Sequence, residues 1–475
     1  MARIRRFSSH RPQGSKESKT AMDHQHSLQR DAMGLIHSVI MGIGGTAPSF
    51  SMAASAATLI AAVGILASAT VLYCGLVMFG ITFAFTYLNR VDPSAGASFT
   101  WVSRIFNPTL GYLSGWTVMV TAVLFMASAT IPAASATLLL LAPDLVDNQV
   151  VVTLIALAWL LLVIAITVRG TAVAARVQTV FISTEILVLA AIAVAAFMQL
   201  GQQAPREITW SDFSPSSFDS QTFASGAMIS LFLFWGWDVT LNLSEETRSG
   251  HRASSWGAAL AMIALIAIFV SIHTVALVVL DDAQIKEAGT NLLFAIAEKL
   301  FPRPWSYLAL LVVMLSTVGA LASSTLSFSR TLFAKSRHGV AHPRWSRLHP
   351  KWKTPHLATL MFVGLGSVLL LVSLVAKDIG EVLRISITAI GLQTAFYYGL
   401  TGFACAWSYR QAARKSITIL VFAVLWPAAS SITMWVAAFL LMRDFDLLTT
   451  SLGLGGILLG LVPLLLQRKK PFKMQ

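Results

Sequence analysis

Two acidic residues stand inside apolar stretches of this 475-residue chain. Glu185 is the only acid in the stretch 173–200, and Asp238 ends the run Phe232–Asp238, which is rich in aromatic residues. A carboxylate at mid-bilayer costs about 2.5–3.5 kcal/mol unless it is paired, hydrated or protonated, so such groups usually serve a function. Glu185 could bind a proton, and Asp238 could face an amine or gate a pocket. The alternatives are packing hydrogen bonds at Glu185 and capping of half-helix amides at Asp238.

Two apolar stretches carry helix-breaking residues. The segment Gly42-Ile43-Gly44-Gly45-Thr46-Ala47-Pro48-Ser49 has three glycines and a proline in eight residues, and Gly236 interrupts the second stretch. A single glycine can simply allow two helices to pack closely. Clustered breakers free backbone amides, which suit a carboxylate, and backbone carbonyls, which suit an ammonium group. The pair of breaks therefore favours a site for a zwitterion.

Further candidates lie near these breaks. Phe232 and Phe234 could stack on a substrate, although aromatic residues in membrane helices often pack against neighbours or lipid. Phe232 stands four residues before Gly236, which makes it the better candidate. Ser323 and Ser324 could line a proton-coupling or cation site, or merely allow close helix packing.

The sequence offers little for enzyme chemistry. Cys74 and Cys405 both lie in apolar runs, so we expect no disulfide framework and no metal cluster. A Walker-type phosphate loop is absent, and the Gly42-x-Gly44 pair lies in an apolar segment rather than after a strand. We therefore expect no cofactor, no metal and no catalytic residues, and we do not expect an enzyme.

Composition places these residues in a membrane. Hydrophobic side chains make up 56% of the chain and charged ones 12%, with a mean hydropathy of +0.72. Stretches long enough to cross a bilayer begin at residue 31, and the segments before and after them are basic tails, 1–30 and 468–475. We predict about twelve crossings, at 31–57, 64–88, 109–141, 149–168, 173–200, 222–247, 254–280, 305–335, 356–376, 380–409, 416–442 and 448–467.

The basic residues predict the orientation of the chain. If both termini are cytoplasmic, 27 of the 34 Lys and Arg residues lie on the cytoplasmic side, as the positive-inside rule requires. The net charge of +13 therefore reflects topology and contact with membrane lipid rather than nucleic acid. We predict a multi-pass protein of the cytoplasmic (plasma) membrane.

Three ordered motifs resemble the amino acid-polyamine-organocation (APC) superfamily of secondary transporters, over most of residues 31–411. Asp92–Arg104, with Gly111–Trp116, is similar to the family's Pro-Ser-x-Gly segment and its Gly-Trp entry to span 3. Gly236-Trp237-Asp238, with Ser244–Arg248, is similar to the Gly-aromatic-acid and Glu-Glu-Thr pattern of span 6. Ser329–Pro343 is similar to the family's exit from span 8.

The resemblance implies an all-α integral membrane fold with a five-plus-five inverted repeat (the LeuT-like or APC fold) and interrupted helices 1 and 6. The repeats would be 31–200 and 201–411, followed by two additional spans in 412–467. Their similar lengths and the break that opens each repeat favour the same division.

The resemblance also implies function. It predicts an amino acid permease that moves amino acids or related amines by alternating access, coupled to protons or to exchange. The substrate carboxylate would meet amides of Gly44, Gly45, Thr46 and Ala47, and its amine would meet the second break and Asp238. Glu185 takes the place of a lysine that many members carry, which indicates a different coupling chemistry. A membrane sensor with the same fold is the alternative, and whether the protein forms a homodimer stays open.

Overall fold

The computed structural model of this chain describes residue 28 and residues 33–169, 171–199, 205–248, 251–375 and 379–466. The predicted basic tails, 1–30 and 468–475, lie outside the described residues except for Leu28. Within the described part the secondary structure is helical, and the one β-type contact is an isolated parallel bridge between Met33 and Thr247. The predicted all-helical fold is confirmed.

The helices follow the predicted order of apolar stretches. The first predicted repeat contains α3 (Leu35–Thr46), α4 (Pro48–Val63), α5 (Ala67–Val91), α6 (Ser98–Ile105), α7 (Pro108–Leu141), α8 (Gln149–Thr167) and α9 (Thr171–Gln199). The second contains α10 (Ser220–Leu233), α11 (Val239–Asn242), α12 (His251–Val279), α13 (Asp282–Ala288), α14 (Leu292–Leu300), α15 (Leu308–Arg337), α16 (His356–Val372) and α17 (Ile379–Tyr409). The remaining helices are α18 (Ile417–Ile419), η12 (Leu420–Leu425), α19 (Trp426–Leu441), α20 (Leu447–Thr450), η14 (Ser451–Gly455), α21 (Gly456–Leu458) and α22 (Leu461–Leu466).

Nine helical segments of the described chain are long and apolar enough to cross a membrane. One of them, Leu35–Val91, contains α3, α4 and α5, so the predicted number of twelve crossings stays a prediction. The first predicted span also ends later than expected, because α4 continues to Val63 before Gly64 adopts a positive φ of 57°. These apolar segments show a multi-pass membrane protein.

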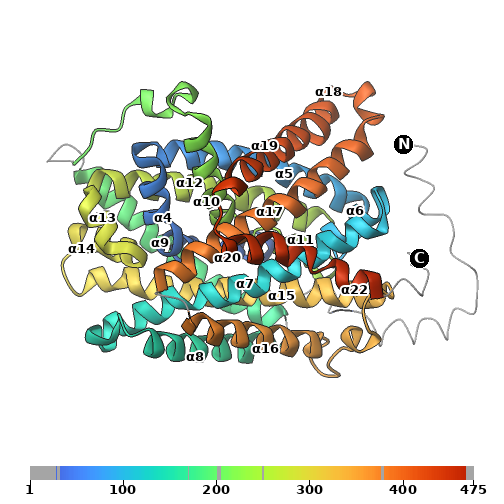
Figure 1. The fold of residues 1–475 in the computed structure, drawn as a ribbon, viewed down its shortest axis with the longest axis horizontal. Coiled ribbons are helices and arrows are strands. Elements are labelled where there is room, and N and C mark those ends of the chain that lie inside the picture. Colours follow the sequence, from blue (N-terminus) through green and yellow to red (C-terminus); the bar gives the residue numbers. More distant parts are fainter. Residues whose placement is uncertain are drawn as a thin grey trace, which may run out of the picture.

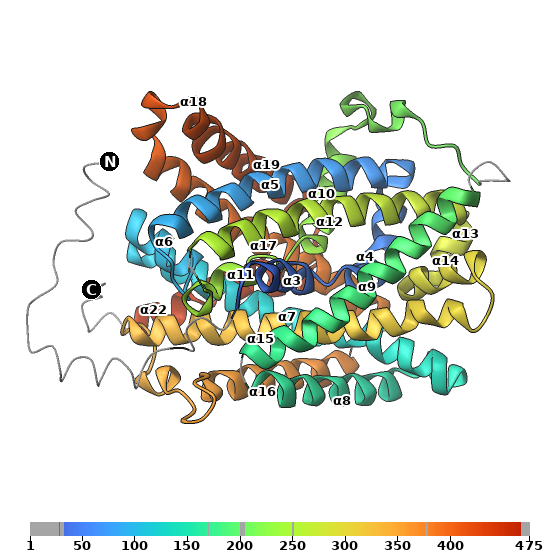
Figure 2. The same ribbon diagram turned by 180° about the vertical axis from the view of Figure 1, so that it is seen from behind.

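The long helices form a bundle around the two broken ones. Figures 1 and 2 show α3 and α11 in the middle, with α8 and α16 together along one edge and α18 and α19 at the opposite edge. Helices α7 and α15 are the most buried of the long segments and pack closely on each other. The polar residues on the buried faces of α3, α11 and α15 are therefore shielded from lipid.

The first break lies between α3 and α4. Ala47 adopts a left-handed conformation (φ 50°, ψ 76°), and its N–H donates to Ile43 O. Pro48 opens α4, where its missing N–H is tolerated and its ring prevents continuation of the preceding helix. The interruption predicted from the glycines and the proline is confirmed.

The second break lies between α10 and α11. Helix α10 ends at Leu233 and α11 begins at Val239, so five residues leave the helical ladder. Gly236 adopts a φ of 109°, a conformation that side chains with a Cβ rarely take. This interruption is also confirmed.

Candidate functional site

The two helix breaks touch each other through glycine backbone. A Cβ built on Gly45 would lie 2.3 Å from Gly236 O, and one built on Gly236 would lie 2.2 Å from Gly45 O. Both distances are far below van der Waals contact, so only glycine fits at either position. The contact brings α3 and the start of α11 together in the centre of the bundle.

A small closed cavity lies beside this contact. It leaves about 10 Å³ for the centre of a water molecule, which is room for roughly one water. Its lining comes from α3, α7, the second break, α15 and α17: Gly45, Val118, Trp235, Gly236, Asp238, Ser323, Ser324, Ser327 and Tyr397. Among these described residues Asp238 is the one carboxylate, and none is basic. The lining is therefore suited to a cation.

Asp238 is held in place by helix α17. Its Oδ1 accepts a hydrogen bond of 2.9 Å from Tyr398 Oη, and its side chain is buried. The neighbouring Tyr397 Oη accepts a hydrogen bond of 2.8 Å from Trp235 Nε1. Sequence reasoning missed both tyrosines. Two consecutive tyrosines near the middle of a predicted span, each with a hydroxyl that needs a partner when buried, are the signal that could have found them.

The predicted aromatic contacts lie beside the cavity rather than in its wall. Phe232 packs against Phe50, with ring centroids 6.4 Å apart, and Phe234 packs against Phe269 at 5.2 Å. Both phenylalanines are buried, and the aromatic residue of this segment that lines the cavity is Trp235. In this arrangement neither phenylalanine side chain lines the cavity.

Glu185 binds the start of α4. Its Oε1 accepts hydrogen bonds from Ser49 N (2.5 Å) and Ser316 Oγ (2.8 Å). Ser316 Oγ in turn accepts a bond of 3.2 Å from Phe50 N. Glu185 is fully buried, and its Oε2 has no hydrogen-bond partner among the described residues. A carboxylate at a helix N-terminus interacts favourably with the free amides and with the helix dipole.

The amides expected to hold a substrate carboxylate are placed differently from the prediction. Gly44, Gly45 and Thr46 form the last turn of α3, and Ala47 N donates to Ile43 O. The amides freed by the break are those of Ser49 and Phe50, because Pro48 restarts the helix. Sequence spacing locates the break but does not show which residue begins the second half-helix.

A glutamine that the sequence reasoning missed contacts the predicted cation site. Gln178 Nε2 donates to Ser323 Oγ at 2.9 Å and to Gly319 O at 2.8 Å. Ser324 Oγ donates back to Ala320 O at 2.9 Å. Glu185 contacts Ser316 instead, seven residues before Ser323 on α15. The structure thus joins Ser323 to Gln178, and Glu185 to the half-helix.

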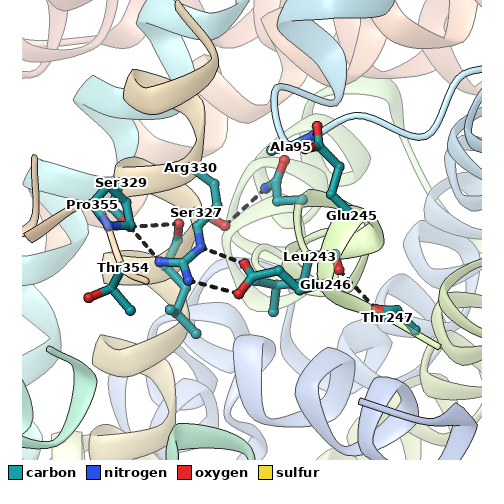
Figure 3. A network of polar contacts seen from close by, with 12 residues as sticks. Ala95, Leu243, Glu245, Glu246, Thr247, Ser327, Ser329, Arg330, Thr354 and Pro355 are labelled. Carbon is teal, nitrogen blue, oxygen red and sulfur yellow. Dashed lines mark hydrogen bonds and ion pairs between the residues drawn. The ribbon is translucent and has the colours of Figure 1, made fainter. Parts of the chain in front are cut away.

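Ion pairs close one end of the bundle, which we call the basic end: Glu245, Glu246, Arg330 and Arg337. Arg330 Nε lies 2.9 Å from Glu246 Oε1, and each of these two side chains is 1% exposed (Figure 3). Arg337 donates two hydrogen bonds to Glu245, whose Oε1 also accepts from Ala95 N at 2.8 Å. The sequence predicts that this end faces the cytoplasm.

The electrostatics of Glu245 follow from its neighbours. Arg337 places a positive charge and two hydrogen-bond donors at this carboxylate, and the Ala95 amide donates a third hydrogen bond. The ionised form is therefore favoured while the basic end is closed.

Lys335 adds an aromatic contact to the same end. Its Nζ lies 3.7 Å from the ring centroid of Tyr112 and donates to Tyr112 O at 3.2 Å. The rings of Phe99 and Trp116 lie within 6 Å of it. These cation–π contacts join α15 to α6 and α7. The basic cluster of the sequence therefore includes buried residues, whereas charge counting assigned it to topology and lipid.

Comparison with known proteins gives a family and two relatives. A family model described as amino acid permease matches residues 30–460. The low-affinity putrescine importer PlaP of Escherichia coli, in strain K12 and in O157:H7, is 26% identical to this chain over 270 residues. That match covers 54% of this chain and 58% of the importer, so the chain spans less than two thirds of the relatives' length.

The family model spans both interrupted helices and nearly all of the described residues. The resemblance to the APC superfamily seen in the motifs is thereby confirmed. This chain belongs to the amino acid permease family.

Proposed function

We propose that this protein is a secondary transporter, not an enzyme, that moves amino acids or related amines across the plasma membrane by alternating access. The observation that carries the proposal is the contact of two broken helices beside a closed cavity that contains one carboxylate. Such a site lies near the middle of the bundle, and transport requires only that its affinity differ between two access states.

The proposed substrate contacts are the predicted ones. Cargo would lie against Gly44, Gly45, Thr46 and Ala47 on one side and against Phe232, Phe234, Gly236 and Asp238 on the other. Asp238 supports this assignment because its carboxylate lines the cavity and is oriented by Tyr398. The similarity to a putrescine importer is consistent with a cationic cargo.

We propose coupling to protons or to counter-exchange, with Glu185, Ser323 and Ser324 as the coupling residues. Oε2 of Glu185 lacks a hydrogen-bond partner in the described chain, so it can take up a proton while Oε1 keeps its bonds to Ser49 and Ser316. Both termini would be cytoplasmic, which puts the basic end on the cytoplasmic side.

Uptake into proteoliposomes tests this proposal. Radiolabelled amino acids and amines are offered with and without an imposed pH gradient, to the native protein and to Glu185→Gln. Accumulation driven by the gradient and lost in the variant would support a proton site at Glu185. Uptake by counter-exchange alone, unchanged in the variant, would leave Glu185 with a structural role. A folded protein that binds these compounds without transporting any of them would be a sensor.

A further inference from the structure

The backbone amides in the first turn of α4 already donate hydrogen bonds to other groups of the protein. Pro48 has no N–H, Ser49 N donates to Glu185, Phe50 N donates to Ser316, and Ser51 N donates to Ala47 O. The start of a half-helix attracts anions, because its amides lack partners within the helix. In this chain Glu185 supplies that anion from α9, which is 136 residues away in sequence from Ser49.

Glu185 stays at this position whichever charge it carries. Oε1 makes both hydrogen bonds, and a proton on Oε2 would leave them in place. A substrate carboxylate could reach these amides only by displacing a fully buried side chain together with the Ser316 hydroxyl. The half-helix is therefore closed to a carboxylate from cargo.

The cavity offers a carboxylate no positively charged partner. Its described lining has the carboxylate of Asp238, the hydroxyls of Ser323, Ser324, Ser327 and Tyr397, and glycine backbone, and it has no Lys, Arg or His. An ammonium group would donate a charge-assisted hydrogen bond to the carboxylate of Asp238. A carboxylate in the same space would meet a like charge, which disfavours binding.

We propose that Glu185 is a specificity-determining residue that takes the place of a substrate carboxylate, and that the cargo is an organic amine without a carboxyl group. This inference rests on the proposed function and narrows its substrate class. Glu185 would supply the hydrogen-bond acceptor at the start of α4 throughout transport. Asp238 would bind the ammonium group of the cargo. Amino acids would be excluded because their carboxylate finds the amides of Ser49 and Phe50 already bonded.

Matched pairs of compounds test the proposal, because each pair differs only by a carboxyl group. The pairs are 1,4-diaminobutane with ornithine, 1,5-diaminopentane with lysine, and 2-phenylethylamine with phenylalanine. Binding is measured in detergent by ligand-induced shifts in melting temperature, and uptake is measured in proteoliposomes. We expect the native protein to bind at least one amine ten times more tightly than its carboxylated partner.

Two substitutions separate the role of Glu185 from general damage. Glu185→Gln keeps a hydrogen-bond acceptor and similar volume at the half-helix, so the preference for the amine should remain. Glu185→Ala frees the amides, so the affinity ratio should shift at least tenfold toward the carboxylated compound. Added formate should bind in the space left by the Glu185 side chain and return the affinity ratio toward that of the native protein. Thr184→Ala on the same helix is the matched control, because the Thr184 side chain is partly exposed and donates to Val180 O of its own helix.

The outcomes distinguish this inference from the function on which it rests. Tighter binding of amino acids than of amines by the native protein would overturn the inference but would not contradict the proposed transport function. An unchanged ratio in a folded, monodisperse Glu185→Ala protein would also overturn it. Binding of amines without uptake of either class would refute transport yet support the specificity of the site. Absence of binding to all six compounds would overturn the inference.

Discussion

Removal of one charge from the buried pair Glu246–Arg330 should open the basic end. The two side chains make bonds of 2.9 and 3.3 Å and are each 1% exposed, so the pair is desolvated while this end is closed. Breaking such a pair leaves a buried charge uncompensated, at a cost of about 3–5 kcal/mol. Glu246→Gln keeps one acceptor for Arg330, so we expect a smaller cost than for complete loss of the partner, about 2–3 kcal/mol.

That free energy has a direct consequence for access to the cavity. In an open state Arg330 is hydrated, so the substitution penalises mainly the closed state. At 1.4 kcal/mol per tenfold change, 2–3 kcal/mol shifts the ratio of open to closed molecules by roughly 30- to 150-fold. The accessibility of the cavity from the basic end should rise by a similar factor until the open state dominates.

Cysteine labelling measures this shift. A single cysteine replaces cavity-lining Ser324 in a protein whose buried Cys74 and Cys405 are changed to alanine. A membrane-impermeant maleimide is then applied from each side of proteoliposomes. The labelling rate from the basic end should increase strongly in Glu246→Gln, whereas the rate from the other side should not increase.

Two further variants make this result interpretable. Glu246→Met combined with Arg330→Met replaces the pair by apolar side chains of similar length and should return the labelling rate close to the native one, because no charge is left buried. Glu298→Gln breaks an exposed pair with Arg303 and should have little effect. Unchanged labelling in folded Glu246→Gln, or equally fast labelling in the double Met variant, would refute the reasoning.

Three other predictions concern the basic end, the contact of the breaks and the cavity. Glu245→Gln should remove the charge that binds Arg337 and raise the labelling rate from the basic end, by less than Glu246→Gln does because this pair is partly exposed; an equal or larger increase would contradict this. Gly236→Ala should prevent the contact with Gly45 and lower the melting temperature, because φ is 109° and the added Cβ would overlap Gly45 O; an unchanged melting temperature would contradict this. Asp238→Asn should weaken amine binding at least tenfold in thermal-shift titrations while the fold is retained, and equal affinity would exclude an ionic contact.

The breaks were predictable because their causes are local. A proline has no N–H to donate to the helical ladder, and Gly236 permits a φ that other residues avoid, so both interruptions are visible in sequence. The acidic residues were predictable as unusual for the same reason, since each lies in an apolar stretch. What could not be predicted was the partner of each group.

The hydrogen-bond and ion-pair partners of these side chains come from segments that are distant in the sequence. Glu185 bonds to Ser49 and Ser316, which are 136 and 131 residues away in the chain, and no periodicity links these positions. Gln178 drew no attention because a neutral amide adds little to charge or hydropathy, yet it reaches Ser323. The burial of Arg330 could not be predicted either, because Arg330 belongs to a basic cluster and membrane topology already accounted for the charge of that cluster.

The position of α11 suggests why its residues connect the cavity to the basic end. Asp238 precedes this short helix and lines the cavity, Asn242 at its end donates to Ser327 Oγ of α15 at 3.1 Å, and Glu246 follows within one turn to pair with Arg330. The three residues are spaced four apart along a segment whose central helix has only four residues and so no long hydrogen-bonded ladder of its own. An opening of the basic end that separates Glu246 from Arg330 must therefore also strain the bond to Ser327 and move the cavity wall. Binding at Asp238 and closure of the basic end are expected to depend on each other, because the same short segment carries both.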